Sequence, residues 1–122
     1  LPLLESDLVE LMLACVNGRL TPDMVKIHPG ACATVVMAAP GYPASYPKGL
    51  PIAGLDALPE DIMVFHAGTA TQDDQLVTSG GRVLAVTARG ENLETAVARA
   101  YNGVDHIHFE NAHYRKDIGR QA

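Results

Sequence analysis

The first apolar pattern along the chain is that of an amphipathic helix. Between Ser6 and Asn17 the apolar residues recur at i, i+3, i+4, i+7 and i+8, which is the spacing of one helix face. These residues are Leu8, Leu11, Met12, Cys15 and Val16. Ser6 is the predicted N-cap, and Gly18 suits the left-handed position after the last turn. The opening Leu-Pro-Leu-Leu is apolar too, so we expect residues 1–20 to end a preceding domain and residues 21–122 to form a second one.

The middle of the chain changes to short apolar runs that contain β-branched residues, which favour strands. The runs are Cys32–Ala38, Ile62–Phe65, Gln75–Ser79 and Arg82–Thr87. Gly80 and Gly81 separate the last two runs, and two glycines in that place predict a tight hairpin. This part of the chain is therefore predicted to be rich in antiparallel strands.

A second helical pattern follows from Asn92 to Asn102. Its apolar residues again lie on one helix face: Leu93, Ala96, Val97, Ala100 and Tyr101. Asn92 is the predicted N-cap and Gly103 the predicted end. His106–Phe109 is predicted to be a last strand before a polar tail. The order of elements indicates an α+β fold in which strands predominate.

Composition narrows the choice of partners. The 122 residues suffice for about one domain with a single core. The formal net charge of -5 argues against binding to nucleic acid or to an anionic membrane, because both need clustered Lys and Arg. No apolar run approaches the roughly 18 residues of a membrane span. Cys15 and Cys32 fall at apolar positions, so we predict buried, reduced thiols in a cytoplasmic protein. The acidic charge makes a soluble partner or a small substrate the expected ligand.

The irregular region contains the first candidate binding site. The sequence GYPASYPKG, residues 41–49, follows a strand and combines stiff prolines with permissive glycines, so we expect an ordered loop. Lys48 in this loop is a point charge that suits a phosphate or a carboxylate. Arg82, just after the two glycines, suits a bidentate contact with such an anion. A plain surface loop and a hairpin tip with solvated side chains explain the same residues, and both interpretations stay open.

Histidines are the candidates for general-base and metal chemistry. His66 can titrate near neutrality, but no Ser, Cys or carboxylate is spaced to form a nucleophile and base pair with it. On a strand, His106, His108 and Glu110 would share a face that zinc or nickel could use, with His113 close behind. No cysteine accompanies them, and polar residues of this kind also keep an edge strand soluble. We therefore assign neither a catalytic residue nor a metal ligand in this chain.

The polar tail is the strongest candidate for anion binding. From Tyr114 to Arg120 it places three basic residues around one acid. Arg115 and Lys116 can hold a phosphate ester, while Asp117 can orient Arg115 or cap a short turn. A charged tail without a ligand would have the same composition.

Taken in order, these motifs resemble the phosphoribosylamine–glycine ligase family, also called glycinamide ribonucleotide synthetases. The motifs are GYPASYPKG, VFHAGT, TSGGRVLAVTARG, a helix that ends in AY, and YRKDIG. They are similar to the C-terminal domain of that family, and the opening LPLLESDLVEL resembles the last helix of its ATP-grasp region. The resemblance covers essentially the whole chain, and the order of the motifs makes it more specific than any one of them.

The resemblance implies an enzyme of de novo purine synthesis that uses ATP and a divalent metal, Mg²⁺ or Mn²⁺, to join glycine to 5-phosphoribosylamine. In that family glycine is activated as an acyl phosphate, which the amine then attacks. ATP and metal would be bound by an upstream ATP-grasp domain of the same chain, so this fragment would be inactive alone.

For residues 21–122 the resemblance implies a β-rich, antiparallel, barrel- or sandwich-like lid that closes over the substrate side. In relatives a basic motif near the C-terminus grips the ribose phosphate. That role transfers to Arg115 and Lys116, with Lys48 and Arg82 as weaker candidates.

Two alternative functions stay open. One is the lid of another ATP-grasp enzyme such as a carboxylase, against which the combination of HAGT with YRKDIG argues. The other is a non-catalytic β module that binds a small anion, against which the exposed apolar start of the chain argues.

Overall fold

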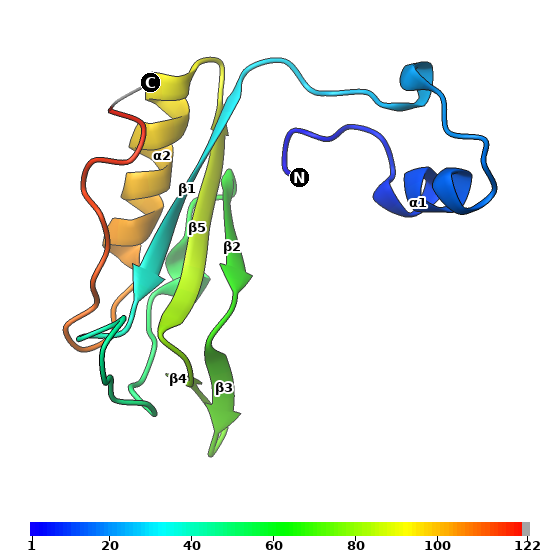
Figure 1. Cartoon of the computed structure of the whole chain (residues 1–122). Coiled ribbons are helices and arrows are strands. Elements are labelled where there is room, and N and C mark those ends of the chain that lie inside the picture. The colour runs from blue at the N-terminus through cyan, green and yellow to red at the C-terminus, as the bar shows by residue number, and fades with distance from the viewer. Residues whose placement is uncertain (121–122) are drawn as a thin grey trace.

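The computed structural model describes residues 1–120 and shows a sheet-and-helix domain that follows an extended N-terminal arm (Figure 1). In chain order the elements are α1 (Leu8–Val16), a 3₁₀ turn (Pro22–Met24), β1 (Ala31–Ala38), a second 3₁₀ turn (Leu55–Ala57), β2 (Ile62–His66), β3 (Thr69–Gln72), β4 (Gln75–Thr78), β5 (Arg82–Gly90) and α2 (Leu93–His106). The mixture of strands and helices confirms the predicted α+β class in outline.

The strands form two separate antiparallel sheets. β5 is the central strand of a three-stranded sheet with the order β1-β5-β2, while β3 and β4 form a two-stranded sheet. Val86 of β5 lies opposite Val35 of β1 and Val64 of β2. Within residues 1–120 this pairing does not close a barrel, because β1 and β2 both pair with β5 and not with each other. The barrel-like form predicted above is therefore replaced by two open sheets.

Helix α2 covers one face of the three-stranded sheet, and the core lies between them (Figure 1). The buried residues of β5 and α2 include Leu84, Val86, Ala88, Ala96, Ala100 and Val104. Gly103 allows the helix to approach closely, since a Cβ there would lie 2.8 Å from Cγ2 of Ile62 and 2.9 Å from Cγ1 of Val86. The predicted helix end at Gly103 is thus wrong: this glycine serves packing, and α2 continues to His106. The predicted N-cap is confirmed, because the Asn92 side chain accepts the backbone N–H of Thr95 at 2.9 Å.

The tight hairpin predicted at Gly80 and Gly81 is also wrong. β4 pairs with β3, and the turn between them is formed by Asp73 and Asp74, which both have positive φ (49° and 61°). Such a pair is typical of a two-residue hairpin turn. The carbonyl oxygen of Gly68 accepts the backbone N–H of Gly80 at 3.2 Å. The chain therefore leaves one sheet and enters the other at the two glycines.

No strand forms at His106–Phe109, because His106 is the last residue of α2. His108 makes only an isolated antiparallel bridge with Ala53, and His113 makes another with Ala38 at the end of β1. The tail then runs back alongside α2 (Figure 1). The predicted shared face of His106, His108 and Glu110 therefore does not exist.

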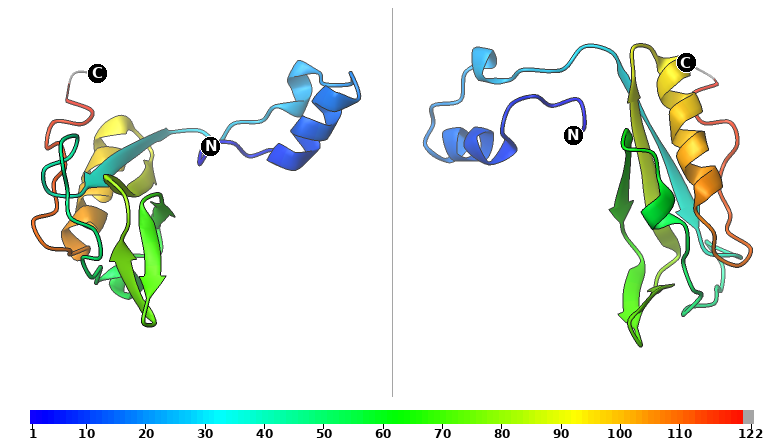
Figure 2. Two further views of the ribbon diagram at one scale, coloured as in Figure 1. Left: turned by 60° about the horizontal axis from the view of Figure 1, so that its bottom comes forward. Right: turned by 180° about the vertical axis from the view of Figure 1, so that it is seen from behind.

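The N-terminal arm carries α1 away from the domain, on the side opposite α2 (Figure 2). Asp7, and not Ser6, caps α1, since the Asp7 carboxylate accepts the backbone N–H of Glu10 at 3.0 Å. The Ser6 hydroxyl instead donates to the carbonyl oxygen of Met24 and accepts the backbone N–H of Lys26, both at 2.7 Å. Ser6 thereby joins the two ends of the arm's loop.

Most of the apolar face of α1 is open to solvent in this chain. Val9, Met12 and Val16 are 63%, 57% and 84% exposed. Cys15 is exposed as well, and Cys32 is half-buried, so the prediction of buried thiols is wrong for Cys15. Within residues 1–120, neither helix is long and apolar enough to cross a membrane.

Candidate anion-binding site

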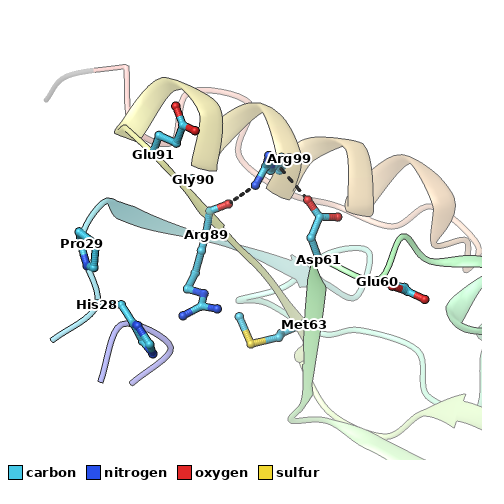
Figure 3. Close-up of a pocket in the computed structure, with 9 residues that line it drawn as sticks. All are labelled: His28, Pro29, Glu60, Asp61, Met63, Arg89, Gly90, Glu91 and Arg99. Carbon is cyan, nitrogen blue, oxygen red and sulfur yellow. Dashed lines mark hydrogen bonds and ion pairs between the residues drawn. The ribbon is translucent and has the colours of Figure 1, made fainter. Parts of the chain in front are cut away.

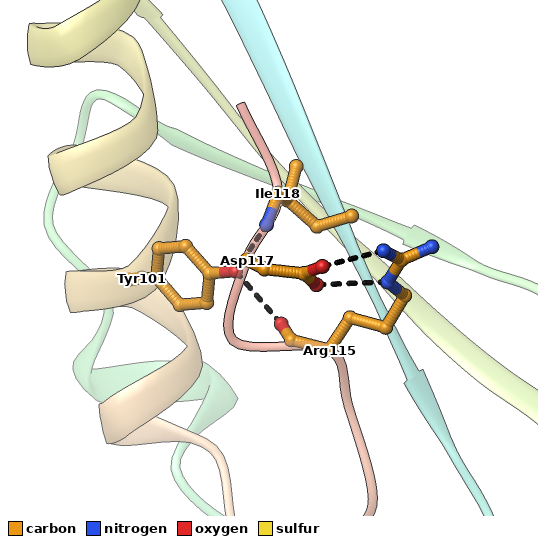
Figure 4. Close-up of polar contacts among 4 residues, drawn as sticks. All are labelled: Tyr101, Arg115, Asp117 and Ile118. Carbon is orange, nitrogen blue, oxygen red and sulfur yellow. Dashed lines mark hydrogen bonds and ion pairs between the residues drawn. The ribbon is translucent and has the colours of Figure 1, made fainter. Parts of the chain in front are cut away.

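The tail forms a turn in which Asp117 orients Arg115 (Figure 4). Nε of Arg115 donates to Oδ1 of Asp117 at 2.8 Å, and Nη2 donates to Oδ2 of the same carboxylate. Two parallel, charge-assisted hydrogen bonds fix both the position and the plane of the guanidinium. This is the orienting role predicted for Asp117.

The ion pair engages only part of the Arg115 guanidinium. The hydrogen bond from Arg115 lowers the pKa of Asp117, and the hydrogen bond and charge of Asp117 raise the pKa of Arg115. The Arg115 side chain is 70% exposed. Its Nη1 edge has no hydrogen-bond partner within residues 1–120, so the guanidinium keeps donors for a ligand.

Tyr101 of α2 brackets this turn. Its hydroxyl donates to the carbonyl oxygen of Arg115 at 2.7 Å and accepts the backbone N–H of Ile118 at 3.1 Å. Both contacts are drawn in Figure 4, where the ring projects from α2 toward the turn. One side chain thus fixes the backbone on both sides of Asp117.

Packing fixes the residues that follow. Ile118 packs against the hydrophobic core. Gly119 has a φ of +76°, which favours glycine, and a Cβ there would lie 2.6 Å from Cγ2 of Val97. The DIG part of the motif therefore anchors the turn from its C-terminal side.

Lys116 borders a hollow of about 310 Å³ next to the turn. Tyr101, Asp105, Tyr114 and Arg120 complete the lining. The basic partner of Lys116 in this hollow is therefore Arg120 and not Arg115. The sequence alone does not single out Arg120, because only the fold brings it beside Tyr101 and Asp105 of α2.

Three of the other motifs meet where β5 begins. A Cβ on Gly68, in HAGT, would lie 2.6 Å from the carbonyl oxygen of Arg82, and a Cβ on Gly81 would overlap the ring of Tyr42. The rings of Tyr42 and Tyr46 pack edge to face with centroids 6.0 Å apart. We call the loop of residues 41–49 with Gly68 and Gly81 the glycine junction. Its glycines and tyrosines serve contacts within the chain.

Lys48 and Arg82 lie at the glycine junction, and both side chains are exposed. Neither forms a salt bridge with another residue of the described chain. The backbone N–H that follows Lys48 donates to the carbonyl oxygen of Thr78 at 2.6 Å, so the loop is ordered as predicted. The four predicted cations thus lie on different segments of the chain: Lys48 and Arg82 border the glycine junction, and Arg115 and Lys116 lie in the tail.

The histidines make local contacts. Nδ1 of His66 lies 3.1 Å from Oγ1 of Thr69, and Nδ1 of His106 lies 2.7 Å from the carbonyl oxygen of Asn102. In the part of the chain that the structure describes, no three His, Cys, Asp or Glu side chains gather as metal ligands would.

A groove of about 450 Å³ lies between the arm and the domain (Figure 3). Arg99 in this groove pairs with Asp61 at 3.3 Å and donates to the carbonyl oxygen of Arg89 at 3.1 Å. Arg89 reaches the carbonyl oxygen of Pro2 in the arm at 3.4 Å. Both acidic and basic side chains line the groove, so its charge favours no single class of ligand.

Comparison with known proteins identifies the family of this fold. Residues 32–121 match the family model described as "Phosphoribosylglycinamide synthetase, C domain". The chain belongs to this family. The matched residues include both the glycine junction and the Arg115 turn.

Relatives of known name agree with this assignment. The chain is 52% identical to "Trifunctional purine biosynthetic protein adenosine-3" of Gallus gallus, over 100% of this chain and 12% of that protein. It is 48% identical to "Phosphoribosylamine--glycine ligase" of Synechocystis, over 100% of this chain and 30% of that protein. The crystal structure of phosphoribosylamine–glycine ligase from Thermotoga maritima is similar with a TM-score of 0.76 and 40% identity, over 89% of this chain and 26% of that one. The chain therefore spans less than a third of the relatives that it matches.

The sequence predicted Arg115, Lys116 and Asp117 as candidates, but it did not predict the contact of Tyr101 with this turn. The signal for Tyr101 was present in the helix that ends in AY, where an aromatic residue lies on the apolar face. Only the fold shows that its hydroxyl reaches the tail, because the two are 14 residues apart from Tyr101 to Arg115.

Proposed function

We propose that this chain is the C-terminal part of an ATP-dependent ligase that joins glycine to 5-phosphoribosylamine, forming glycinamide ribonucleotide in de novo purine biosynthesis. The observation that carries the proposal is the C-domain match together with relatives named phosphoribosylamine–glycine ligase. The activity would belong to the complete protein, of which this chain is one part.

In this proposal the Arg115 turn binds the phosphate of 5-phosphoribosylamine. Support comes from the exposed guanidinium, whose plane is fixed by Asp117 while its Nη1 edge is open. A fixed guanidinium loses little side-chain entropy when it binds a phosphate. Lys116 adds a second charge beside the turn, and Lys48 and Arg82 are weaker contacts. The contribution of this chain is then to hold and orient the substrate.

The proposal places the sites for ATP and for Mg²⁺ or Mn²⁺ on an upstream ATP-grasp domain. The residues present here do not fit a metal, because no suitable group of His, Cys, Asp or Glu occurs within residues 1–120. Glycine, 5-phosphoribosylamine and ATP are the proposed small-molecule partners, and the proposed location is the cytoplasm.

The arm fits the proposed domain division. We assign residues 1–20 to the end of the ATP-grasp domain and residues 21–122 to a lid on its substrate side. The exposed apolar residues of α1, among them Met12 and Val16, support this division, because no other segment of residues 1–120 covers them.

Turnover by the complete protein tests the proposed function. The protein should form glycinamide ribonucleotide and release ADP and phosphate only when glycine, 5-phosphoribosylamine, ATP and a divalent metal are all present. Omitting each component in turn is the control. ADP formation that needs bicarbonate in place of glycine would point to a carboxylase and contradict the proposal.

A further inference from the structure

We infer that Tyr101 is a positioning residue for anion binding: its hydroxyl fixes the turn that presents the Arg115 guanidinium. The inference rests on the proposed function, in which Arg115 binds the phosphate of 5-phosphoribosylamine. Tyr101 itself acts through the backbone of the turn and does not contact the substrate.

The Tyr101 hydroxyl uses both of its hydrogen-bonding roles on one turn (Figure 4). It donates to the carbonyl oxygen of Arg115 at 2.7 Å and accepts the N–H of Ile118 at 3.1 Å. These two groups flank Asp117, whose carboxylate holds the guanidinium. The hydroxyl therefore sets the backbone from which both members of the ion pair extend.

The tyrosine stands on a rigid support. Its neighbour Ala100 is fully buried, and Val104 on the next turn of α2 is 2% exposed. Both belong to the core that joins α2 to the three-stranded sheet. A group that is held by a packed helix positions a site more accurately than a group on a free loop.

Other contacts keep the tail folded without this hydroxyl. Ile118 packs against the core, and the ring of Tyr114 lies 6.4 Å from the ring of Tyr101, tilted by 47°. Changing Tyr101 to Phe preserves these apolar contacts and removes only the two hydrogen bonds. The Arg115 backbone can then move, and small displacements of a positioning group weaken substrate binding.

The expected kinetic signature follows from where the phosphate lies. The phosphate is remote from the amine that reacts, so a contact with it is made equally in the ground state and the transition state. Loss of such uniform binding raises KM and leaves kcat unchanged. ATP binds elsewhere in the proposed enzyme, so its KM should not change.

The test compares Tyr101→Phe with Tyr42→Phe in the complete protein. Tyr42 is the matched control, because the same atom is removed from a tyrosine whose ring packs against Tyr46 at the glycine junction and does not border the Arg115 turn. We expect Tyr101→Phe to raise KM for 5-phosphoribosylamine about threefold to tenfold, from the loss of one or two ordinary hydrogen bonds. Its kcat and its KM for ATP should stay within about twofold of wild type, and Tyr42→Phe should change none of these values.

Hydrogen–deuterium exchange of the same proteins gives a second readout that needs no turnover. The amide of Ile118 should exchange faster in Tyr101→Phe than in wild type or Tyr42→Phe. Equal KM values for the two variants, a parallel rise in KM for ATP, or unchanged exchange at Ile118 would each overturn the inference. An inactive wild type would instead contradict the proposed function, and the exchange result would still decide the role of Tyr101.

Discussion

The glycine junction and the Arg115 turn both contain sequence motifs of the same family, but the residues of these motifs have different structural roles. At the junction, Gly68 and Gly81 are needed because another part of the chain occupies the space of a side chain. At the turn, Arg115 and Asp117 pair at the surface and leave an edge of the guanidinium open. The family's motifs therefore serve close packing at the glycine junction, whereas at the Arg115 turn they leave a side chain available for binding.

The largest effect is expected at the junction, for Gly68→Ala. The new Cβ would lie 2.6 Å from the carbonyl oxygen of Arg82, which belongs to the backbone and cannot swing aside. We expect the free energy of unfolding to fall by about 2–3 kcal/mol, as for an overpacked site. Urea unfolding of the 122-residue chain measures it.

Gly18→Ala is the control for this prediction. Gly18 also lies in a turn, with φ of +63°, but a Cβ there meets no atom within 4 Å. Only the conformational cost of about 1 kcal/mol is expected. If Gly68→Ala costs no more than Gly18→Ala, then the junction is not held by close packing.

The second prediction addresses the turn. Arg115→Ala in the complete protein should raise KM for 5-phosphoribosylamine about tenfold to a hundredfold, because hydrogen bonds to a charged group are lost. KM for ATP should hardly change. Arg115→Lys keeps the charge but cannot form the bidentate pair with Asp117. Its KM for 5-phosphoribosylamine should therefore lie between the values of wild type and Arg115→Ala. Unchanged KM values for both variants would exclude Arg115 from the site.

A smaller effect is expected for the cations of the junction. Lys48→Ala and Arg82→Ala each remove an exposed charge without a salt-bridge partner within residues 1–120. We expect KM for 5-phosphoribosylamine to rise about twofold to fivefold in each, since exposed charges contribute weakly. Steady-state measurement of this KM for Lys48→Ala, Arg82→Ala and Arg115→Ala compares the contributions of the two regions to substrate binding. A larger effect for Lys48 or Arg82 than for Arg115 would reverse the comparison.

The smallest effect concerns the acidity of Asp117. Its pKa is lowered by the hydrogen bond and charge of Arg115, so NMR titration of its carboxyl should give a value below the ordinary aspartate pKa of about 3.9. A lowered folded pKa means that the pair stabilises the fold above that ordinary value and stops doing so as pH falls through the lowered one. Arg115→Ala should return the pKa toward its ordinary value. No change in that variant would show that the pair does not form in solution.

Local sequence patterns predicted correctly those elements whose formation does not depend on contacts with distant segments. The helical spacing before Asn17 and after Asn92 and the β-branched run of β1 each persist in the fold. The predictions failed where a distant segment decides the outcome. Gly103 lies within α2 because Ile62 and Val86 approach it, and Gly80 lies between two sheets because β4 pairs with β3.

The candidate site shows the same limit. Charge and spacing predicted a site at Arg115, Lys116 and Asp117 from adjacent residues alone. The link to Tyr101 depends on how the tail returns along α2. β3 escaped prediction because Thr69–Gln72 has only one apolar residue and is exposed along most of its length.

One titration tests the central claim that the Arg115 turn is the main contact of the phosphate and the glycine junction a weaker one. Isotope-labelled chain is titrated with ribose 5-phosphate while the backbone amides and the arginine Nε–H signals are followed by NMR. The account predicts saturable shifts at the Arg115 Nε–H and the Ile118 amide, and smaller shifts in residues 41–49. Shifts confined to the junction, with the Arg115 signal unchanged, would contradict it.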